Sequence, residues 1–395
     1  MPLELMIVAG EASGDAHAAE LITALRRRHP GLHCFGCGGE RMAAAGCELL
    51  VSVSQLAVMG LAEVVTHLPR LHRLWRELRQ ALRRRRPAGI VLVDFPDFNL
   101  RLAAAAHAAG IPVVYFISPQ LWAWRSGRVK QIRRTVRRMI CIFPFEPGFY
   151  ARQGVEVAGV GHPLVDRIAQ ARRELPSVAD FRAGIGAGSG ATLIALLPGS
   201  RRRELDYHLP TMLEAAARLR AEPGSGPPCE FVLPVAPTLT AAAVAAIIPE
   251  RLRPAIHLVA STQMYAALTH SRLAIVASGT ATVETAMLGT PMIVVYRLSA
   301  WSYWLGRNLV RTPHVAMVNL IADKPVVPEL IQSAFRVENV LNWVHRLLPE
   351  SEQRLQMQQD LALVSQRLGP PGAIERAAEE VERTLRLQPT PARKA

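Results

Sequence analysis

The feature that most constrains the fold is the regular alternation of short, wholly apolar runs with longer helical patterns. In the first half of the chain these runs are LELMIVAG, HCFGCGG, GIVLVDFP, IPVVYFISP, RMICIFP and VEVAGVGHP. Strands that are apolar on both faces and separated by helices predict a parallel sheet with right-handed crossovers. A second series, TLIALLPGS, FVLPVA, IHLV, LAIVASG and PMIVVYR, predicts a second sheet. We therefore expect an α/β chain with two doubly wound, Rossmann-like domains that face each other across a deep cleft.

Length and composition fit two folded domains followed by helices. The 395 residues are 50% apolar and 20% charged, which is typical of globular proteins. The series of strands breaks after residue 165 in a charged and then glycine-rich stretch. We predict an N-terminal domain over 1–168, a second domain over 190–340, C-terminal helices over 341–387 that pack back on the first domain or on a partner chain, and a disordered tail over 388–395.

The charge distribution favours an anionic partner. The net charge is +14, and residues 1–170 hold 22 Arg or Lys against 13 Asp or Glu. Phosphate, nucleic acid and acidic lipid headgroups all suit such a basic surface. The chain has no aromatic–basic repeat and no recognisable nucleic-acid-binding motif, so we do not expect nucleic acid as a partner.

Cysteine usage and the lack of long apolar stretches indicate a reducing, cytoplasmic compartment. Cys34 and Cys37 have the spacing of a metal knuckle, but no second pair follows, so we expect buried thiols rather than a zinc site. No run approaches the ~20 apolar residues of a spanning helix, and no signal segment precedes the first strand. We expect neither a metal nor a cofactor.

Two turns of the second domain have the form of anion sites. In LLPGSRRREL, a strand ends and Ser200 and Arg201 open a helix, so that backbone N–H groups and a guanidinium lie together. The alternative is a serine-capped helix with solvated arginines. In VASGTATVETAMLGTP, the helix start at Gly279 and Thr280 suits a pyrophosphate, and Glu284, one turn along, suits ribose hydroxyls. Dinucleotide and Walker fingerprints are absent.

Carboxylates follow two predicted strands of the first domain. In VDFPDFN, Asp94 and Asp97 come at the carboxyl end of a buried strand, where a carboxylate is able to accept a proton from an attacking hydroxyl. The alternative is that both cap the following helix. In AGEASGD, Glu11 and Asp15 stand in a turn where a dinucleotide site would need bare glycine.

An apolar segment precedes a strongly basic helix. It fits either core packing or an amphipathic surface in anionic lipid, and its apolar residues are Val58, Met59, Leu61, Val64, Val65 and Leu68. From 71 to 82 we favour core packing, because leucines recur at helical spacing. In SPQLWAWR, Trp124 and Arg125 suit a sugar or phosphate, or simply stack on each other.

A set of motifs occurs in the order found in one known family. They are AGEASGD, MGLAEVV, VDFPDFN, SPQLWAWR, FPFE, GHPLVD, LLPGSRRRE, ASGTATVE and TPHVAMVNLIAD, from residue 9 to about 330. The chain thereby resembles the lipid-A-disaccharide synthase family. The resemblance implies a metal-independent, inverting glycosyltransferase of the GT-B type. Such an enzyme joins UDP-2,3-diacylglucosamine to 2,3-diacylglucosamine 1-phosphate (lipid X) through a β-1,6 bond and releases UDP.

The resemblance also implies roles for individual residues. Asp97 would be the base that deprotonates the acceptor's 6-hydroxyl, with Asp94 and Glu11 as alternatives. Glu11 would bind or orient the acceptor sugar, because hydroxyls suit a carboxylate. The UDP-sugar would be held by Ser200, Arg201, Ser278, Gly279, Thr280, Glu284 and Asn319.

Membrane contact and assembly are implied in the same way. The apolar residues of 56–68, with Trp124 and Arg125, would meet the acceptor and the anionic cytoplasmic face of the inner membrane. Family members are able to form homodimers by exchanging C-terminal helices. A UDP-N-acetylglucosamine 2-epimerase, or a GT-B enzyme with a soluble acceptor, would share the nucleotide site but would not need the apolar segment.

Overall fold

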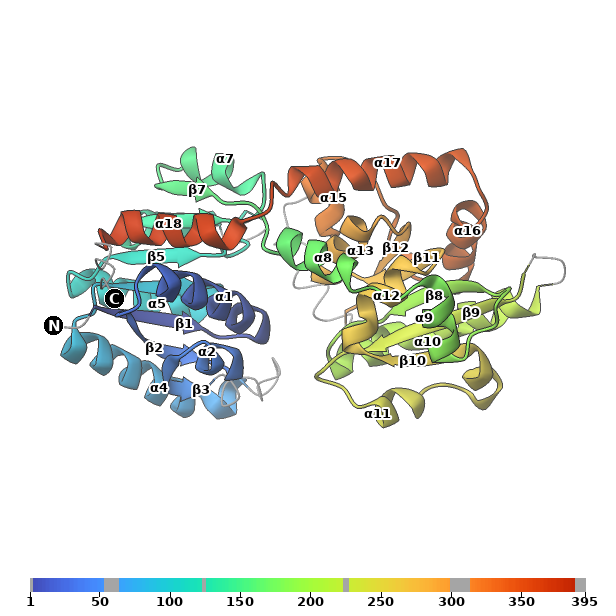
Figure 1. Cartoon of the computed structure of the whole chain (residues 1–395), viewed down its shortest axis with the longest axis horizontal. Coiled ribbons are helices and arrows are strands. Elements are labelled where there is room, and N and C mark those ends of the chain that lie inside the picture. Colours follow the sequence, from blue (N-terminus) through green and yellow to red (C-terminus); the bar gives the residue numbers. More distant parts are fainter. Residues whose placement is uncertain (1–2, 53–63, 123–125, 223–226, 299–312, 388–395) are drawn as a thin grey trace, which may run out of the picture. The chain divides into compact units, whose positions relative to one another are not determined.

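The computed structural model describes residues 3–52, 64–122, 126–222, 227–298 and 313–387, without the side chains of 12, 64–71 and 126. The chain divides into two compact units (Figure 1). Unit 1 comprises Met1–Pro163 and Gly369–Ala395, and unit 2 comprises Leu164–Leu368. The predicted tail over 388–395 lies outside the described residues.

Unit 1 is built on a seven-stranded parallel sheet with the order β3-β2-β1-β4-β5-β6-β7. The strands are β1 (Glu4–Ala9), β2 (His33–Gly38), β3 (Cys47–Ser52), β4 (Gly89–Val93), β5 (Val113–Phe116), β6 (Arg138–Cys141) and β7 (Val157–Gly159). The helices of this unit are α1 (Ala12–Arg28), α2 (Glu40–Ala44), α4 (Val64–Arg85), α5 (Pro96–Ala108), α6 (Val129–Thr135), α7 (Glu146–Ala151) and α18 (Ala373–Leu385).

Both faces of this sheet are covered, so its central strands are apolar throughout. Met6 and Val8 pack in the core under α4, α5 and α6, whereas Leu5 and Ile7 pack in the core under α1 and α18. Cys37 belongs to the first of these cores and Cys34 to the second. The two thiols therefore lie on opposite faces, and burial raises the pKa of each to about 12.

The helix α18 joins unit 1 although it comes last in the chain. It packs beside α1 (Figure 1). Its Glu382 carboxylate lies 2.6 Å from Nε2 of His29 and also pairs with Arg28, and Glu380 pairs with Arg138 at 3.0 Å. The helices expected as one C-terminal group over 341–387 are thus divided between the units, because α16 (Val337–Leu347) and α17 (Glu352–Arg367) pack in unit 2.

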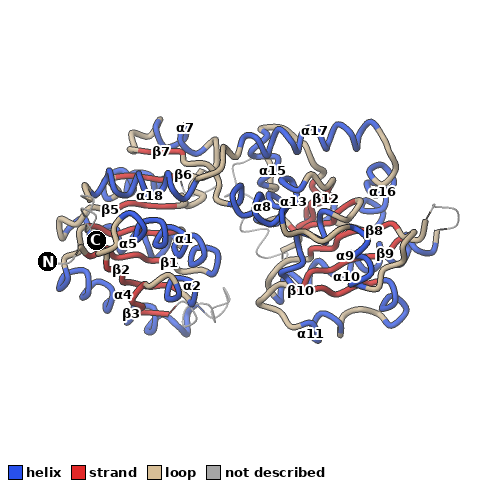
Figure 2. Tube along the Cα trace, in the orientation of Figure 1, coloured by secondary structure: helices blue, strands red, loops and turns tan. Residues whose placement is uncertain are grey.

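Unit 2 has a six-stranded parallel sheet with the order β10-β9-β8-β11-β12-β13. Helices surround its strands (Figure 2). The strands are β8 (Thr192–Leu197), β9 (Cys229–Val235), β10 (Ile256–Ala260), β11 (Leu273–Ala277), β12 (Met292–Tyr296) and β13 (Glu329–Ile331). Around them lie α8 (Leu164–Arg173), α9 (Val178–Ile185), α10 (Arg202–Ala221), α11 (Ala241–Ala245), α12 (Met264–Thr269), α13 (Thr280–Leu288), α15 (Met317–Ala322), α16 and α17.

The prediction of two doubly wound parallel sheets is confirmed, and every predicted apolar run forms a strand. The edge strands β3 and β13 were not predicted. Within the described part of the chain, no helix combines the length and apolarity needed to cross a membrane.

Candidate functional site

The turn after β8 is shaped by a carboxylate from the helix that follows it. The Glu204 carboxylate accepts the N–H groups of Ser200 (2.8 Å) and Arg201 (3.2 Å). Gly199 has φ +121°, and a Cβ there would overlap the Glu204 side chain. The two N–H groups that the sequence offered to an anion are therefore occupied. A phosphate at this turn must meet the exposed Arg201 side chain or displace Glu204.

A buried histidine, which sequence reasoning missed, ties this turn to the neighbouring part of the sheet. His208 Nδ1 lies 2.7 Å from the Pro198 carbonyl oxygen, and Nε2 lies 2.9 Å from the Arg297 backbone nitrogen. A carbonyl only accepts and an N–H only donates, so the proton must be on Nδ1. Burial lowers the pKa of His208, which keeps this neutral tautomer. The only sequence signal was a polar residue on the apolar side of a helix.

The turn after β11 lies at the same edge of the sheet, because β8 and β11 are paired neighbours. Ser278 donates its backbone N–H to Val295 (2.9 Å) and its hydroxyl to the Val315 carbonyl (3.2 Å). Gly279 and Thr280 are exposed at the start of α13. The ends of these two strands thus bring Arg201 and the α13 N-terminus to one edge of the sheet, where both supply positive potential.

Glu284 lies one turn into α13 and is held by a tyrosine. Its carboxylate accepts the Tyr265 hydroxyl at 2.8 Å. Burial raises the pKa of Glu284, while the Tyr265 hydrogen bond and the charge of Arg167 oppose that rise. Tyr265 comes from α12 and Arg167 from α8, so two further elements fix the carboxylate that was predicted to bind ribose.

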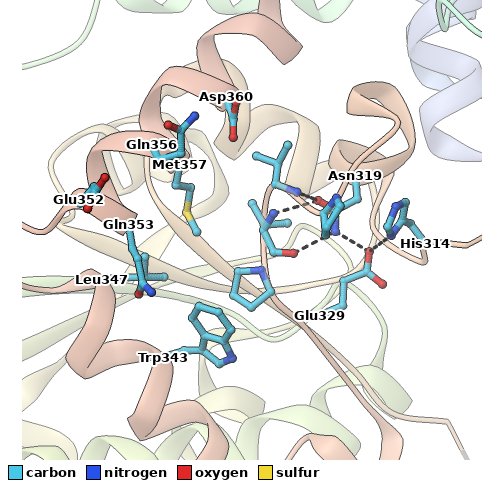
Figure 3. A pocket seen from close by; sticks show the side chains of 14 residues that line it. His314, Asn319, Glu329, Trp343, Leu347, Glu352, Gln353, Gln356, Met357 and Asp360 are labelled. Atoms are coloured by element: carbon cyan, nitrogen blue, oxygen red, sulfur yellow. Dashed lines mark hydrogen bonds and ion pairs between the residues drawn. The ribbon is translucent and has the colours of Figure 1, made fainter.

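The Asn319 side chain is buried and its hydrogen-bonding capacity is used within the protein (Figure 3). Its Nδ2 donates to the Val327 carbonyl (2.9 Å) and to Glu329 Oε1 (2.8 Å). Its Oδ1 accepts the N–H groups of Val326 (2.8 Å) and Val327 (2.9 Å). An amide offers two donors and two acceptor sites. The Asn319 side chain therefore uses all of its hydrogen-bonding groups within the protein, and its contact with the UDP-sugar stays a prediction.

The same asparagine is connected to the β11 turn through Glu329. Glu329 also accepts the N–H groups of Val315 (2.9 Å) and Ala316 (3.0 Å), and the Val315 carbonyl receives the Ser278 hydroxyl. A pocket of about 670 Å³ is lined by Asn319, Glu329 and Trp343, among other residues (Figure 3). Asn319 is thus connected to Ser278 through Glu329 and residues 315–316.

In unit 1, acidic residues follow two paired strands. Ala9 of β1 pairs with Val93 of β4, so Glu11 and Asp94 emerge from neighbouring strand ends. Burial, and next the charge of Glu11, raise the pKa of Asp94 to about 6. Asp94 has φ +48°, and its carbonyl oxygen accepts the Tyr115 hydroxyl (2.5 Å) and the Asn99 amide (2.7 Å). Two buried side chains therefore hold this strained residue in place.

The two acids of AGEASGD have different roles. Asp15 is buried and accepts the N–H groups of Gly39 (2.6 Å), Arg41 (3.2 Å) and Met42 (3.2 Å), so it caps α2. Glu11 is the exposed N-cap residue of α1, but its side chain makes no capping hydrogen bond. Of the two, Glu11 is the carboxylate available to a ligand.

The environment of Asp97 differs from that of Asp94, because Asp97 is exposed and paired with an arginine. It stands in the first turn of α5, its side chain is 66% exposed, and Oδ1 is 2.6 Å from an Arg128 guanidinium nitrogen. Of the three candidate bases, Asp94 is thus partly buried, whereas Asp97 and Glu11 are exposed.

Most of the residues predicted to contact the acceptor or the membrane lie outside the part of the chain that the structure describes. Val58, Met59, Leu61, Trp124 and Arg125 lie outside the described residues, and the side chains of Val64, Val65 and Leu68 in α4 are not described. Further along α4, three side chains are buried in the core as predicted, and these are Leu74, Leu78 and Leu82.

Comparison with known proteins identifies the family. Residues 5–379 match the family described as Lipid-A-disaccharide synthetase. The chain belongs to the lipid-A-disaccharide synthase family. It is 45% identical over 383 residues to the lipid-A-disaccharide synthase of Anaeromyxobacter dehalogenans (strain 2CP-C), a match that covers 97% of this chain and 98% of that protein.

Solved structures show the fold of this lipid-A-disaccharide synthase family member. A putative UDP-N-acetylglucosamine 2-epimerase from Listeria monocytogenes matches with a TM-score of 0.67 at 13% identity, over 99% of this chain and 98% of that one. The calicheamicin glycosyltransferase CalG4 matches with a TM-score of 0.63 at 16% identity, over 98% of each chain. The GT-B prediction is confirmed, and the chain is a glycosyltransferase of lipid A biosynthesis.

Proposed function

We propose that this chain transfers 2,3-diacylglucosamine from UDP to the 6-hydroxyl of lipid X, forming a β-1,6-linked disaccharide 1-phosphate and UDP. The observation that carries the proposal is the family match over residues 5–379, which spans both units and so both predicted substrate sites.

Unit 2 is the donor side in this proposal. The Arg201 guanidinium and the α13 N-terminus at Gly279 and Thr280 receive the diphosphate, since both supply positive potential at one edge of the sheet. Glu284 binds the ribose hydroxyls, which compete with Tyr265 for the carboxylate. Ser200 contributes its side chain only, because its N–H is held by Glu204.

Unit 1 is the acceptor side. The acceptor O6 attacks the anomeric carbon of the donor while the bond from that carbon to the diphosphate oxygen breaks. The electron pair leaves with UDP, and the O6 proton passes to a carboxylate. We assign this base to Asp97, with Glu11 orienting the acceptor sugar. Asp94 is the alternative base, since its pKa of about 6 is closer to the working pH.

The acyl chains and the lipid phosphate place the reaction at a membrane surface. We propose that the chain acts at the anionic cytoplasmic face of the inner membrane. The exposed arginines of α4, Arg73, Arg76, Arg83 and Arg84, support this attachment. We also propose that the apolar residues of 56–68 and the pair Trp124 and Arg125 meet lipid, and that two chains are able to assemble as a homodimer.

The test is a product assay on the purified chain. UDP-2,3-diacylglucosamine and lipid X are presented in mixed micelles with EDTA, and products are identified by mass spectrometry. We expect disaccharide 1-phosphate and UDP in equal amounts. UDP binding without disaccharide would overturn the acceptor assignment, and conversion of UDP-N-acetylglucosamine to its 2-epimer would favour the epimerase instead.

Single carboxylate variants identify the base. Asp97→Asn should lose most turnover and retain UDP binding, because a positioned base contributes about 10²–10⁴ in rate. Near-normal turnover in Asp97→Asn with loss in Asp94→Asn or Glu11→Gln would move the role to that residue.

A further inference from the structure

The strand next to β4 also ends in a strained turn. Ile117 follows β5 directly and has φ +64°, a conformation that a β-branched residue adopts only when its surroundings enforce it. Val93, the last residue of β4, pairs with Phe116, the last residue of β5. The Asp94 N–H donates to the Phe116 carbonyl at 3.3 Å. Ile117 and the strained Asp94 therefore stand side by side at one edge of the unit 1 sheet.

A fully buried carboxylate holds the segment that begins at Ile117. Glu146 Oε1 accepts the Ser118 hydroxyl (2.9 Å) and the Trp122 indole N–H (3.3 Å). Its Oε2 accepts the N–H groups of Ile142 (3.2 Å) and Phe143 (3.0 Å). One carboxylate thus joins the segment after β5 to the segment after β6.

A second layer of contacts supports the same segment. The Tyr150 hydroxyl donates to the Pro119 carbonyl (3.1 Å) and lies 3.1 Å from the Ser118 hydroxyl oxygen. The Trp122 ring meets Phe145 edge-on, with the ring centroids 4.8 Å apart. Burial raises the pKa of Glu146 to about 7, while the four donors oppose that rise. Burying a carboxylate is unfavourable in free energy, and the hydrogen bonds of this one fix the conformation of residues 118–122.

We propose that Glu146 is a positioning residue for the acceptor side, because it fixes Ser118–Trp122 beside the edge that carries Asp94 and Glu11. The inference rests on the proposed function, which puts the acceptor at this edge. Glu146 is itself buried, so it acts on the acceptor through Ser118 and Trp122.

Two variants that break the same contact test the proposal. Glu146→Gln retains an oxygen for Ile142 and Phe143 but turns an amide N–H₂ toward the Trp122 N–H, so that two donors face each other. Trp122→Phe removes that N–H and retains an aromatic ring against Phe145. The matched control is Glu156→Gln, which neutralises a carboxylate of the same unit that is 82% exposed.

Steady-state kinetics on the intact chain separate the two substrates. We expect kcat/KM for lipid X to fall roughly 10- to 100-fold in Glu146→Gln and Trp122→Phe, because small misplacements of binding groups have effects of that size. The KM for the UDP-sugar should change less than about twofold, since the donor residues are in unit 2. The double variant should be no worse than the poorer single variant, because both remove one contact. Glu156→Gln should match the unaltered chain.

Three other outcomes would overturn the inference. If the unaltered chain makes disaccharide but Trp122→Phe leaves the lipid X kinetics unchanged, Glu146 has no positioning role, whatever the folding of Glu146→Gln. If KM for both substrates rises in parallel with a lowered Tm, the role is general stability. If the unaltered chain makes no disaccharide, the proposed function fails and this role fails with it.

Discussion

The partly buried carboxylate of Asp94 should reduce the stability of the folded chain at neutral pH. Its pKa is about 6 in the folded protein against an ordinary value of 3.8. A difference of about 2 units corresponds to about 3 kcal/mol at full ionisation. We therefore expect Asp94→Asn to raise the free energy of unfolding by about 1–3 kcal/mol at pH 7.5. Asparagine suits the perturbation because it tolerates the positive φ and is able to accept the Phe95 backbone N–H that the Asp94 carboxylate accepts.

The pH dependence follows from the sign of the shift. The folded chain holds the Asp94 proton more tightly than the unfolded chain. Stability from this group is therefore present below pH 3.8 and is lost as the pH rises to about 6. The advantage of Asp94→Asn should accordingly fall to less than half at pH 4.5. Urea unfolding of the intact chain at both pH values, followed by circular dichroism and tryptophan fluorescence, measures it.

Asp97→Asn is the matched control for this prediction. Its carboxylate is exposed and paired with Arg128, so its removal should change stability by less than about 1 kcal/mol. The reasoning would be refuted if Asp94→Asn were no more stable than the unaltered chain at pH 7.5, or if its advantage were equal at the two pH values. A gain in stability together with a loss of turnover would mark Asp94 as a functional charge.

Three further predictions address the other elements of the two units. Arg201→Ala should weaken UDP binding by roughly 10- to 100-fold in calorimetry, because a charge-assisted hydrogen bond contributes about 1.5–3 kcal/mol; unchanged affinity would remove this residue from the donor site. Asn319→Ala should cost about 2–4 kcal/mol in urea unfolding, since it leaves the N–H groups of Val326 and Val327 without their acceptor, and fast amide exchange there would verify the cause. Leu385→Ala should lower stability by about 2–5 kcal/mol while UDP affinity stays constant, and a loss of both would contradict the assignment of α18 to unit 1.

The central strands could be read from the sequence because both of their faces are buried. Five of the six residues of β8 are buried, all but Thr192, and they form a continuous apolar run. The edge strand β3 has only two buried residues, Cys47 and Val51, among its six, and β13 has only three residues in all, so neither gives such a run. The periodicity of α18 shows which of its faces is apolar, but not which sheet that face covers.

The sequence predicted where the candidate site residues lie better than it predicted what each of them binds. Strand ends located Arg201, Glu284, Glu11 and Asp94, because parallel sheets collect ligand-binding residues there. The occupation of the Ser200 and Arg201 N–H groups had a sequence signal that was not used, a glutamate at the third helical position. The engagement of Asn319 by Glu329 had none, because those contacts depend on how two separate segments pack.

The late position of α18 in the chain has a consequence for synthesis on the ribosome. Unit 2 is one uninterrupted segment, whereas unit 1 needs a helix made more than 200 residues after its last strand. At about 5–20 residues per second, the nascent sheet waits roughly 10–40 s with part of one apolar face uncovered. The apolar side chains of Val114 and Ile140, on the two strands that α18 contacts, are then open to chaperones or to a neighbouring nascent chain. Newly made unit 1 should therefore be the part of this protein that most needs protection before release.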